Sequence, residues 1–404
     1  MMAGRGAAWP LARTAQAGTG GRTGAVAGRT GEAGGVEALP AGRLRLIAAP
    51  QGQAGGGMGR ITAYLLQEQR GRTDLPPLEA LESRGGGAAA LSAVWVAWAA
   101  ARIAALAVRG RVSVLHVNVA ERGSVVRKGV LAGVARLFGV PVVLHLHAAQ
   151  IVAFYDGLPR AGQWLVRRMF RSAALCVVLG EPWRRWVGSL GVPDARIRVL
   201  RNGVPRLAGW RARAAGEPFR LLFLGNLFER KGIADLLDAL AHVDAAGGPV
   251  VGAGAAACVL VVAGGGDVAR YSARATALGL GERVRFAGWV DQAEAAACLA
   301  RADALVLPSY DEGLPLVILE ALSLGVPVVT TPVGAIPEVL SDGDTALLVP
   351  PGDIAALAGA LRRLAGDPAL AARLSECGRA LYEREFTLPV FAERVAALHA
   401  EVGL

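Results

Sequence analysis

The sequence predicts an α/β protein with two Rossmann-like, doubly wound domains that face a central cleft. Three observations predict this class. From Leu44 onward, short apolar runs alternate with helical patterns, as in βαβ units on a parallel sheet. The 404 residues are too many for one ordinary core and fit two domains of about 150–200 residues each. A hydrophobic content of 53% is enough to fill both cores and excludes global disorder.

The first domain is expected over residues 43–205, and it is taken to bind the acceptor. Its strands are the apolar runs RLRLIAAP, SVLHVNV, PVVLHLH, ALCVVLG and RIRVLR. The apolar run 88–108 is long enough to suggest a membrane span, but its alanines and central Arg102 favour a core helix. Residues 1–42 are rich in Gly, Ala and Arg and lack the apolar stretch of a secretory signal. We interpret them as a disordered extension, or as the product of an upstream start.

The second domain is expected over residues 218–385, and it is taken to bind a nucleotide sugar. Turn residues break the pattern before it, so residues 206–217 are predicted to be the linker. Its strands are FRLLFLG, CVLVVAG, RVRFAGWV, DALVLPS, VPVVTT and ALLVP. Residues 386–404 are predicted to form a helix that packs back toward the first domain. In open α/β sheets, ligands bind at the carboxyl ends of the strands, so the loops that follow these runs are the candidate sites.

The charge and the cysteines limit the class of partner. A net charge of +10 suggests an anionic partner: nucleic acid, a membrane surface or a phosphorylated substrate. An aromatic content of 5%, with no recognisable docking module, disfavours nucleic acid. The four cysteines form no CxxC pair, so neither a zinc site nor a disulfide framework is predicted. Arginine supplies nearly all the positive charge, which makes the two lysines, Lys128 and Lys231, stand out.

The stretch EGLPLVILEALSLG (312–325) carries the strongest candidate site. Pro315 suits the first position of a helix that ends near Leu324, because Gly325 follows. The free amides at the beginning of such a helix, those of Gly313 and Leu314 among them, favour an anion such as a diphosphate.

Two acids flank the beginning of this helix. Glu312 precedes it, and Glu320 lies five residues past Pro315, roughly 7.5 Å along the axis. Carboxylates at that separation can accept hydrogen bonds from hydroxyls of two different sugars. The alternative is that Glu312 is a simple helix N-terminal acid and that Glu320 is solvated.

Three further loops follow strands. Lys231 precedes Gly232 at the opening of a helix and can reach a phosphate, although a surface lysine at a turn is the alternative. Gly56 and Gly57 belong to a glycine run that permits close backbone approach to a ligand. His147 ends the strand PVVLHLH, where it can orient a sugar hydroxyl or be purely structural.

Together these loops resemble the retaining glycosyltransferases of group 1 (glycosyltransferase family 4), which have the two-lobed GT-B fold. The resemblance covers nearly everything from Leu44 onward. It rests on the ordered motifs GGGMG, LHLHA, RVLRNGV, FLGNLFERKG, VVAGGGD, RVRFAGWV and E-x7-E (Glu312 to Glu320) followed by GVPVVTTPVGAIPEV. An E-x7-E pair alone is weakly specific, whereas the ordered set is strongly specific.

The resemblance implies a metal-independent, retaining hexosyltransferase with no cofactor. The donor would be a nucleoside diphosphate sugar, and the acceptor a saccharide or lipid-linked saccharide in cell-surface polysaccharide or glycolipid synthesis. The implied roles are donor-sugar binding by Glu312, ribose binding by Glu320, diphosphate binding by Lys231, amide donation by Gly313 and Leu314, closure over the donor by Gly56 and Gly57, base binding by Gly265, Trp289 and Val290, and a place at the reaction centre for His147.

The sequence departs from the family pattern at the phosphate-binding loop. Asn226, which we retain among the donor-binding residues, stands where the family usually has an arginine. One phosphate-binding cation is therefore missing, and Arg230 is the candidate substitute.

A basic surface is predicted on the first domain. In the segment 122–138, Val126, Val130, Val134 and Leu137 form one stripe of a helix, and Arg122, Lys128 and Arg136 lie opposite. With WLVRRMFR and PWRRWV this is typical of peripheral membrane contact, and a solvated face is the alternative. We expect a cytoplasmic protein that contacts the inner face of the membrane.

Two other classes of function stay open. One is an epimerase or hydrolase of nucleotide sugars on the same fold, which needs acid/base carboxylates and histidines in the first-domain cleft. The other is a non-catalytic sugar-nucleotide binder.

Overall fold

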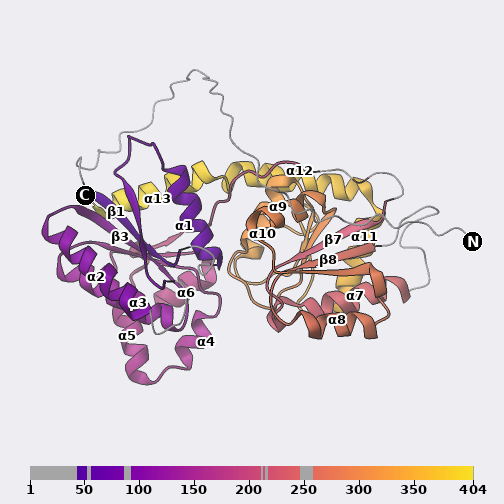
Figure 1. The fold of residues 1–404 in the computed structure, drawn as a ribbon, viewed down its shortest axis with the longest axis horizontal. Coiled ribbons are helices and arrows are strands. Elements are labelled where there is room, and N and C mark those ends of the chain that lie inside the picture. Colours follow the sequence, from indigo (N-terminus) through magenta and orange to yellow (C-terminus); the bar gives the residue numbers. More distant parts are fainter. Residues whose placement is uncertain are drawn as a thin grey trace, which may run out of the picture. The chain divides into compact units, whose positions relative to one another are not determined.

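The computed structural model describes residues 43–51, 56–85, 92–210, 213, 217–245 and 258–403 (Figure 1). The predicted extension at 1–42 and part of the predicted linker at 206–217 lie outside these ranges. The described chain forms two parallel six-stranded sheets, which confirms the predicted α/β class. The domain boundaries given above stay a prediction.

The first sheet has the strand order β2-β1-β3-β4-β5-β6. Its strands are β1 (Leu44–Ala49), β2 (Leu78–Glu82), β3 (Val112–Val119), β4 (Val142–Leu146), β5 (Leu175–Val178) and β6 (Ile197–Val199). Strand β2 was not predicted, because its sequence LEALE contains two glutamates and no β-branched residue. It forms because it lies at the sheet edge, where only Leu81 of its five residues is fully buried.

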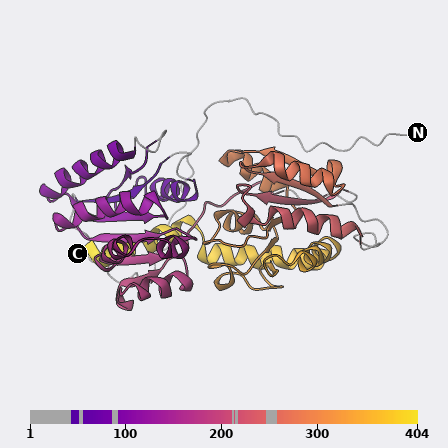
Figure 2. The ribbon, with the colours of Figure 1, turned by 90° about the horizontal axis from the view of Figure 1, so that it is seen from below.

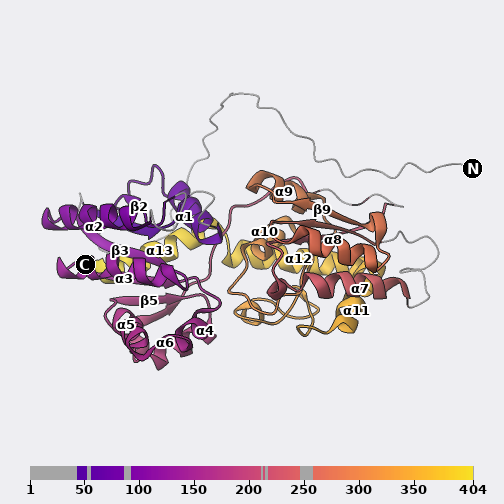
Figure 3. The ribbon, with the colours of Figure 1, turned by 60° about the horizontal axis from the view of Figure 1, so that its bottom comes forward.

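Helices cover this sheet in two layers. They are α1 (Gly56–Glu68), α2 (Ser92–Val108), α3 (Gly123–Leu137), α4 (Ile151–Asp156), α5 (Arg160–Arg171), α6 (Glu181–Ser189) and α13 (Leu388–Gly403). The crossover from β1 to β2 runs opposite to those from β2 to β3 and from β3 to β4, so right-handed connections put α1 on one face and α2 and α3 on the other. Helix α13 contacts α1 and β3, whereas α3 contacts both α2 and α5. Figures 1 and 3 both show α2, α3 and α5 in a row.

The second sheet has the order β12-β11-β10-β7-β8-β9. Its strands are β7 (Phe219–Leu224), β8 (Cys258–Ala263), β9 (Val284–Gly288), β10 (Ala304–Leu307), β11 (Val328–Thr330) and β12 (Leu347–Leu348). The helices of this half are α7 (Ile233–Ala245), α8 (Val268–Ala277), α9 (Gln292–Arg301), α10 (Leu316–Leu324), α11 (Ile354–Gly366) and α12 (Pro368–Glu385). Figure 2 shows α12 and α13 in yellow, as consecutive helices at the end of the chain.

The structure contradicts two expectations about helix faces. Helix α2 is not a core helix, because it buries small residues and Ile103 while Trp98 stays 47% exposed. Helix α3 meets the prediction only in part: Arg122 and Arg136 are exposed as predicted, whereas Lys128 is buried and Val126 is 68% exposed. The buried Lys128 ammonium is accommodated because it donates to the carbonyl of Ala48, at 2.8 Å, and to the Ser83 hydroxyl. Within the described ranges, no helix combines the length and hydropathy needed to cross a bilayer.

Candidate active site

Helix α10 begins and ends nearly where the sequence predicted. It starts at Leu316, one residue later than expected, because Pro315 has the extended backbone of an N-cap, with φ −63° and ψ 128°. It ends at Gly325, which adopts the left-handed conformation with φ 72°. All nine of its residues are buried. The amino end of α10 is therefore held in a fixed position after β10.

Glu312 and Lys231 form an ion pair beside this helix end. The Lys231 ammonium donates to Oε1 of Glu312 at 2.5 Å, and the Ser309 hydroxyl donates to the same oxygen at 2.8 Å. Lys231 ends a 3₁₀ turn (Glu229–Lys231) and precedes Gly232, whose φ is 68°. A Cβ at Gly232 would lie 2.0 Å from the Pro308 carbonyl oxygen, so only glycine lets the lysine turn approach the end of β10.

The segment after β11 fixes the Glu312 loop from the other side. The Ala335 amide donates to the Gly313 carbonyl at 3.0 Å. Gly334 has φ 60°, and a Cβ there would lie 2.0 Å from the Glu312 carbonyl oxygen. The predicted motif GVPVVTTPVGAIPEV thus supports the backbone that presents Glu312, Gly313 and Leu314.

Glu320 is buried in α10 and faces α1, so the solvated alternative for this acid is wrong. Its Oε1 lies 3.1 Å from Nη1 of Arg60 and 3.5 Å from the Tyr64 hydroxyl. Burial raises the pKa of Glu320, and the Arg60 charge opposes that shift. Gln292 donates to the Tyr64 hydroxyl at 2.7 Å, which ties α9 to the same cluster. Arg60 and Tyr64 were missed, although both follow the GGGMG run within two helical turns.

The predicted glycine pair reaches the start of α10. Gly56 opens α1 with φ 52°. A Cβ on Gly57 would lie 3.8 Å from Cδ1 of Leu316, the first residue of α10. The structure therefore brings Gly57 together with the loop that carries Glu312, Gly313 and Leu314.

A second group forms at the carboxyl ends of β7, β8 and β9. A Cβ on Gly265 would lie 3.6 Å from Cδ1 of Trp289 and 3.8 Å from Oδ1 of Asn226. Trp289 is 59% exposed and is followed by the half-buried Val290. Arg230, the candidate substitute cation, donates to the Asp311 carbonyl at 3.0 Å, so it braces the loop before Glu312.

His147 belongs to a separate cluster on the first sheet. Its Nε2 lies 3.3 Å from Oδ1 of Asn118, whose amide nitrogen donates to the Thr62 hydroxyl at 3.0 Å. The Thr62 hydroxyl in turn donates to the Met58 carbonyl at 3.0 Å. This direction of donation makes Oδ1 of Asn118 an acceptor, so Nε2 of His147 carries its proton and Nδ1 has the free lone pair. Burial lowers the pKa of His147 to about 3, which keeps the ring neutral near pH 7.

Three more histidines extend inward from His147. The ring of His145 lies 4.0 Å from that of His147, centroid to centroid. His116 bonds to His145 at 3.2 Å and to His399 of α13 at 2.8 Å. Burial lowers the pKa of all three, that of His116 to about 4. His116 and His399 were missed, because residues 283 positions apart meet only in the fold.

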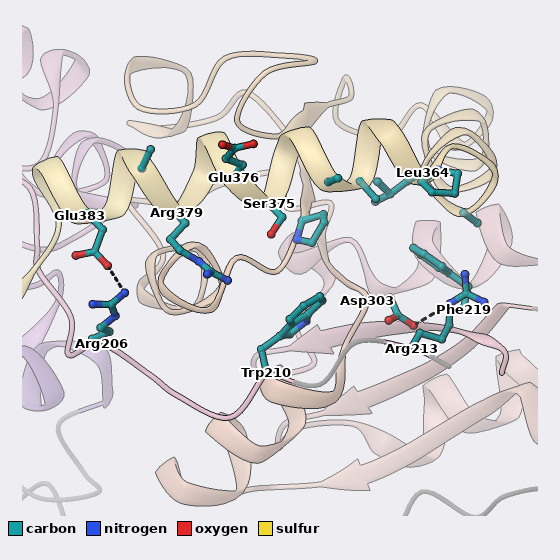
Figure 4. Close-up of a pocket in the computed structure, with 16 residues that line it drawn as sticks. Arg206, Trp210, Arg213, Phe219, Asp303, Leu364, Ser375, Glu376, Arg379 and Glu383 are labelled. Carbon is teal, nitrogen blue, oxygen red and sulfur yellow. Dashed lines mark ion pairs between the residues drawn. The ribbon is translucent and has the colours of Figure 1, made fainter. Parts of the chain in front are cut away.

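A cavity of about 750 Å³ lies elsewhere, beside α12 (Figure 4). Trp210, Phe219 and the side chains of α12 line it, and two ion pairs join residues of the lining, Arg206 with Glu383 and Arg213 with Asp303. Its described lining contains none of the predicted site residues. Across the ranges that the structure describes, no group of three or more His, Cys, Asp or Glu side chains could hold a metal ion.

Two family models match the chain along most of its length. Residues 37–203 match the glycosyl transferase 4-like domain, and residues 210–381 match the glycosyl transferases group 1. The phosphatidyl-myo-inositol mannosyltransferase of Mycobacterium leprae is 32% identical over 290 residues, which are 65% of this chain and 74% of that protein. The chain belongs to the group 1 glycosyltransferase family. The resemblance that its motifs predicted is thus confirmed.

Other relatives of this group 1 glycosyltransferase differ in identity and in the share of their length that the chain covers. The glycogen synthase of Mycobacterium tuberculosis is 31% identical over 285 residues, and this chain covers only 64% of that protein's length. Sucrose-phosphate synthase from Thermosynechococcus elongatus superposes with a TM-score of 0.70 at 20% identity, covering 88% of this chain and 98% of that one. Anabaena HepE, in complex with UDP and glucose, gives 0.68 at 18% identity with the same coverage of each chain. These two structures show the GT-B fold.

Proposed function

We propose that this group 1 glycosyltransferase moves a sugar from a nucleoside diphosphate sugar to a saccharide or lipid-linked saccharide, with retention of anomeric configuration. The observation that carries the proposal is the Lys231–Glu312 pair beside the amino end of α10. A lysine and a ring of helix N-terminal amides favour a diphosphate, and the buried carboxylate beside them can accept hydrogen bonds from the hydroxyls of a sugar joined to it.

The remaining donor contacts follow from the same arrangement. Lys231 would exchange part of its contact with Glu312 for a phosphate oxygen, and the amides of Gly313 and Leu314 would donate to the diphosphate. Glu320 would share its acceptor capacity between Arg60 and the ribose hydroxyls. Asn226, Gly265, Trp289 and Val290 would surround the base.

The chemical step would be a front-face displacement. The bond from the anomeric carbon to the departing phosphate oxygen breaks, and a bond to the acceptor oxygen forms on the same face. The departing oxygen takes the acceptor's proton, so the configuration is retained. Lys231 and the α10 amides stabilise the charge that grows on the diphosphate, without a metal ion in this scheme. Neutral His147 would use its free Nδ1 to accept a hydrogen bond from a sugar hydroxyl and so position it.

The relatives support the substrate classes. Their names include a phosphatidyl-myo-inositol mannosyltransferase and the amylovoran biosynthesis glycosyltransferase AmsK of Erwinia amylovora. The Anabaena HepE structures include one with UDP-glucose. We therefore propose a nucleotide-sugar donor and a role in cell-surface polysaccharide or glycolipid assembly, at the cytoplasmic side of the membrane.

Incubation with radiolabelled UDP- and GDP-sugars and membrane extracts tests the proposal. Label transferred to lipid or saccharide supports it. Epimerised or hydrolysed free sugar would instead support the nucleotide-sugar epimerase or hydrolase. Binding in a thermal-shift screen of nucleotide sugars, without turnover of any, would support a non-catalytic binder.

A further inference from the structure

Three neighbouring helices of the first sheet turn apolar side chains outward. Helices α2, α3 and α5 lie side by side, and each of them leaves large apolar side chains exposed. The exposed large apolar residues on them are Val94, Trp95, Trp98, Val108, Val126, Val130, Leu137, Trp164 and Leu165. Leu137 is 83% exposed and Val108 is 72% exposed. We call this surface the α2–α3–α5 face.

These apolar residues stay exposed although α2 and α3 bury small or charged residues on their other faces. Helix α3 buries the charged Lys128 toward the sheet while its valines at 126 and 130 point outward. Helix α2 has a single charged residue, Arg102, and it buries Ser92, Val96, Ala99 and Ile103 while Trp98 stays exposed. Large contiguous apolar surface on a folded protein usually marks an interaction site.

The charge on the same three helices has one sign. Their sequences contain eight Arg and Lys residues and no Asp or Glu. Between Ser92 and Arg171 there are eleven basic and two acidic residues, so this segment contributes +9, nearly all of the chain's net +10. Arginine side chains lie over the exposed indoles: Arg102 is 5.4 Å from the Trp98 ring and Arg168 is 5.6 Å from the Trp164 ring.

We propose that the α2–α3–α5 face docks on an anionic lipid bilayer. Tryptophan is favoured at the membrane interface, and arginine can extend its guanidinium to headgroup phosphates while its stem lies along apolar surface. Valine and leucine between them enter the boundary of the acyl chains, and the basic residues are attracted to the negative leaflet. The contact differs from the membrane surface predicted from the sequence, because α2 supplies two of its indoles and α3 contributes its apolar stripe.

A second copy of the chain fits this face poorly. A symmetric dimer would place the seven arginines of these helices opposite seven of the other copy, and none of the three helices contributes an acid, which is strongly unfavourable across a desolvated interface. Nucleic acid would be attracted by the charge, but exposed valines and leucine offer it neither hydrogen bonds nor stacking. The bilayer is the partner that uses both the charge and the apolar side chains.

The docking proposal rests on the proposed function in one respect only, which is that docking would bring the enzyme to a lipid-linked acceptor. Flotation with vesicles tests it. We expect the full chain to bind vesicles that contain phosphatidylglycerol at least tenfold more tightly than vesicles of pure phosphatidylcholine. Trp98→Ser with Trp164→Ser, and separately Arg168→Glu, should each weaken binding to the anionic vesicles at least tenfold.

Matched controls come from the second half of the chain. Trp289→Ser removes an indole that is 59% exposed, compared with 58% for Trp164, and Arg363→Glu reverses an exposed charge on α11. Neither should change vesicle binding by more than twofold. Thermal-shift response to UDP or GDP should be unchanged in the α2–α3–α5 variants, so loss of docking and loss of the donor site are distinguishable.

Three results would overturn the docking proposal. The first is equal binding to neutral and anionic vesicles, and the second is unchanged binding by the Trp98 and Trp164 double variant. The third is the absence of vesicle binding. Concentration-dependent dimerisation in light scattering would then indicate a second copy of the chain as the partner, and salt-sensitive binding to a poly(dT) oligonucleotide would indicate nucleic acid.

Discussion

Helices α10 and α2 are both strongly apolar and carry a single charged residue each, yet their surroundings differ. Helix α10 is buried on all sides, and its one acid, Glu320, faces Arg60 of α1. Helix α2 buries only one narrow face, and its one cation, Arg102, lies over an exposed indole. Two apolar helices with one charge each can therefore have different roles. The charge of α10 lies in the proposed donor site, and the charge of α2 lies on the proposed docking surface.

The largest difference is expected from the cations near each helix. Lys231→Ala should lower kcat/KM for the donor about a thousandfold, roughly 4 kcal/mol, because it leaves the leaving diphosphate without its cation. Arg109→Ala, just beyond α2 on the exposed surface, is the control and should change kcat/KM less than twofold with a soluble acceptor. Full activity of Lys231→Ala would contradict a diphosphate site at the amino end of α10.

Truncation of an apolar side chain should lower the free energy of unfolding more in α10 than in α2. Ile318→Ala in α10 creates a cavity in a fully buried site and should reduce the free energy of unfolding by about 2–5 kcal/mol. Val108→Ala in α2, at a site 72% exposed, should change it by less than about 0.5 kcal/mol. Urea unfolding measures both, and equal effects would mean that α2 is covered in solution.

The two ion pairs give a finer comparison. Arg60 and Glu320 lie 3.1 Å apart with side-chain exposures of 34% and 5%. Arg102 and Glu79 lie 2.5 Å apart, each side chain 38% exposed. Double-mutant cycles should give a coupling of about 1–3 kcal/mol for the first pair and below about 1 kcal/mol for the second. A stronger coupling at Arg102 would contradict the exposure of α2.

The smallest effect concerns acid and the buried histidines of the first sheet. Because burial lowers the pKa of His116 to about 4, the unfolded chain binds more protons between about pH 6.5 and pH 4, and stability falls as the pH falls through that window. His116→Gln should reduce this slope by up to about 1.4 kcal/mol per pH unit. Urea unfolding at a series of pH values measures the slope, and an unchanged slope in His116→Gln would contradict this source of acid sensitivity.

The sequence was informative where local chemistry decides the structure. Apolar runs located most strands, and Pro315 and Gly325 located the ends of α10, because caps and strand patterns depend on neighbouring residues. It failed for α2 and α3, since periodicity shows that a helix has two faces without showing which one meets the sheet. Lys128 misled the orientation of α3, because a buried ammonium needs acceptors that only the folded ends of β1 and β2 supply.

The candidate site was predicted in the same uneven way. Glu312 and Lys231 could be chosen because each lies in a loop that follows a strand, and Glu320 because of its spacing from Glu312 along the next helix. Arg60, Tyr64 and His399 could not, since their importance comes from partners hundreds of residues away, as in the contact of Arg60 with Glu320. Contacts between distant segments have no local sequence signal.

A crystal structure with a nucleoside diphosphate bound would locate the donor site. We expect diphosphate oxygens within hydrogen-bonding distance of the Gly313 and Leu314 amides and of the Lys231 ammonium, with the ribose at Glu320. A nucleotide seated instead in the cavity beside α12, against Trp210, would contradict this expectation.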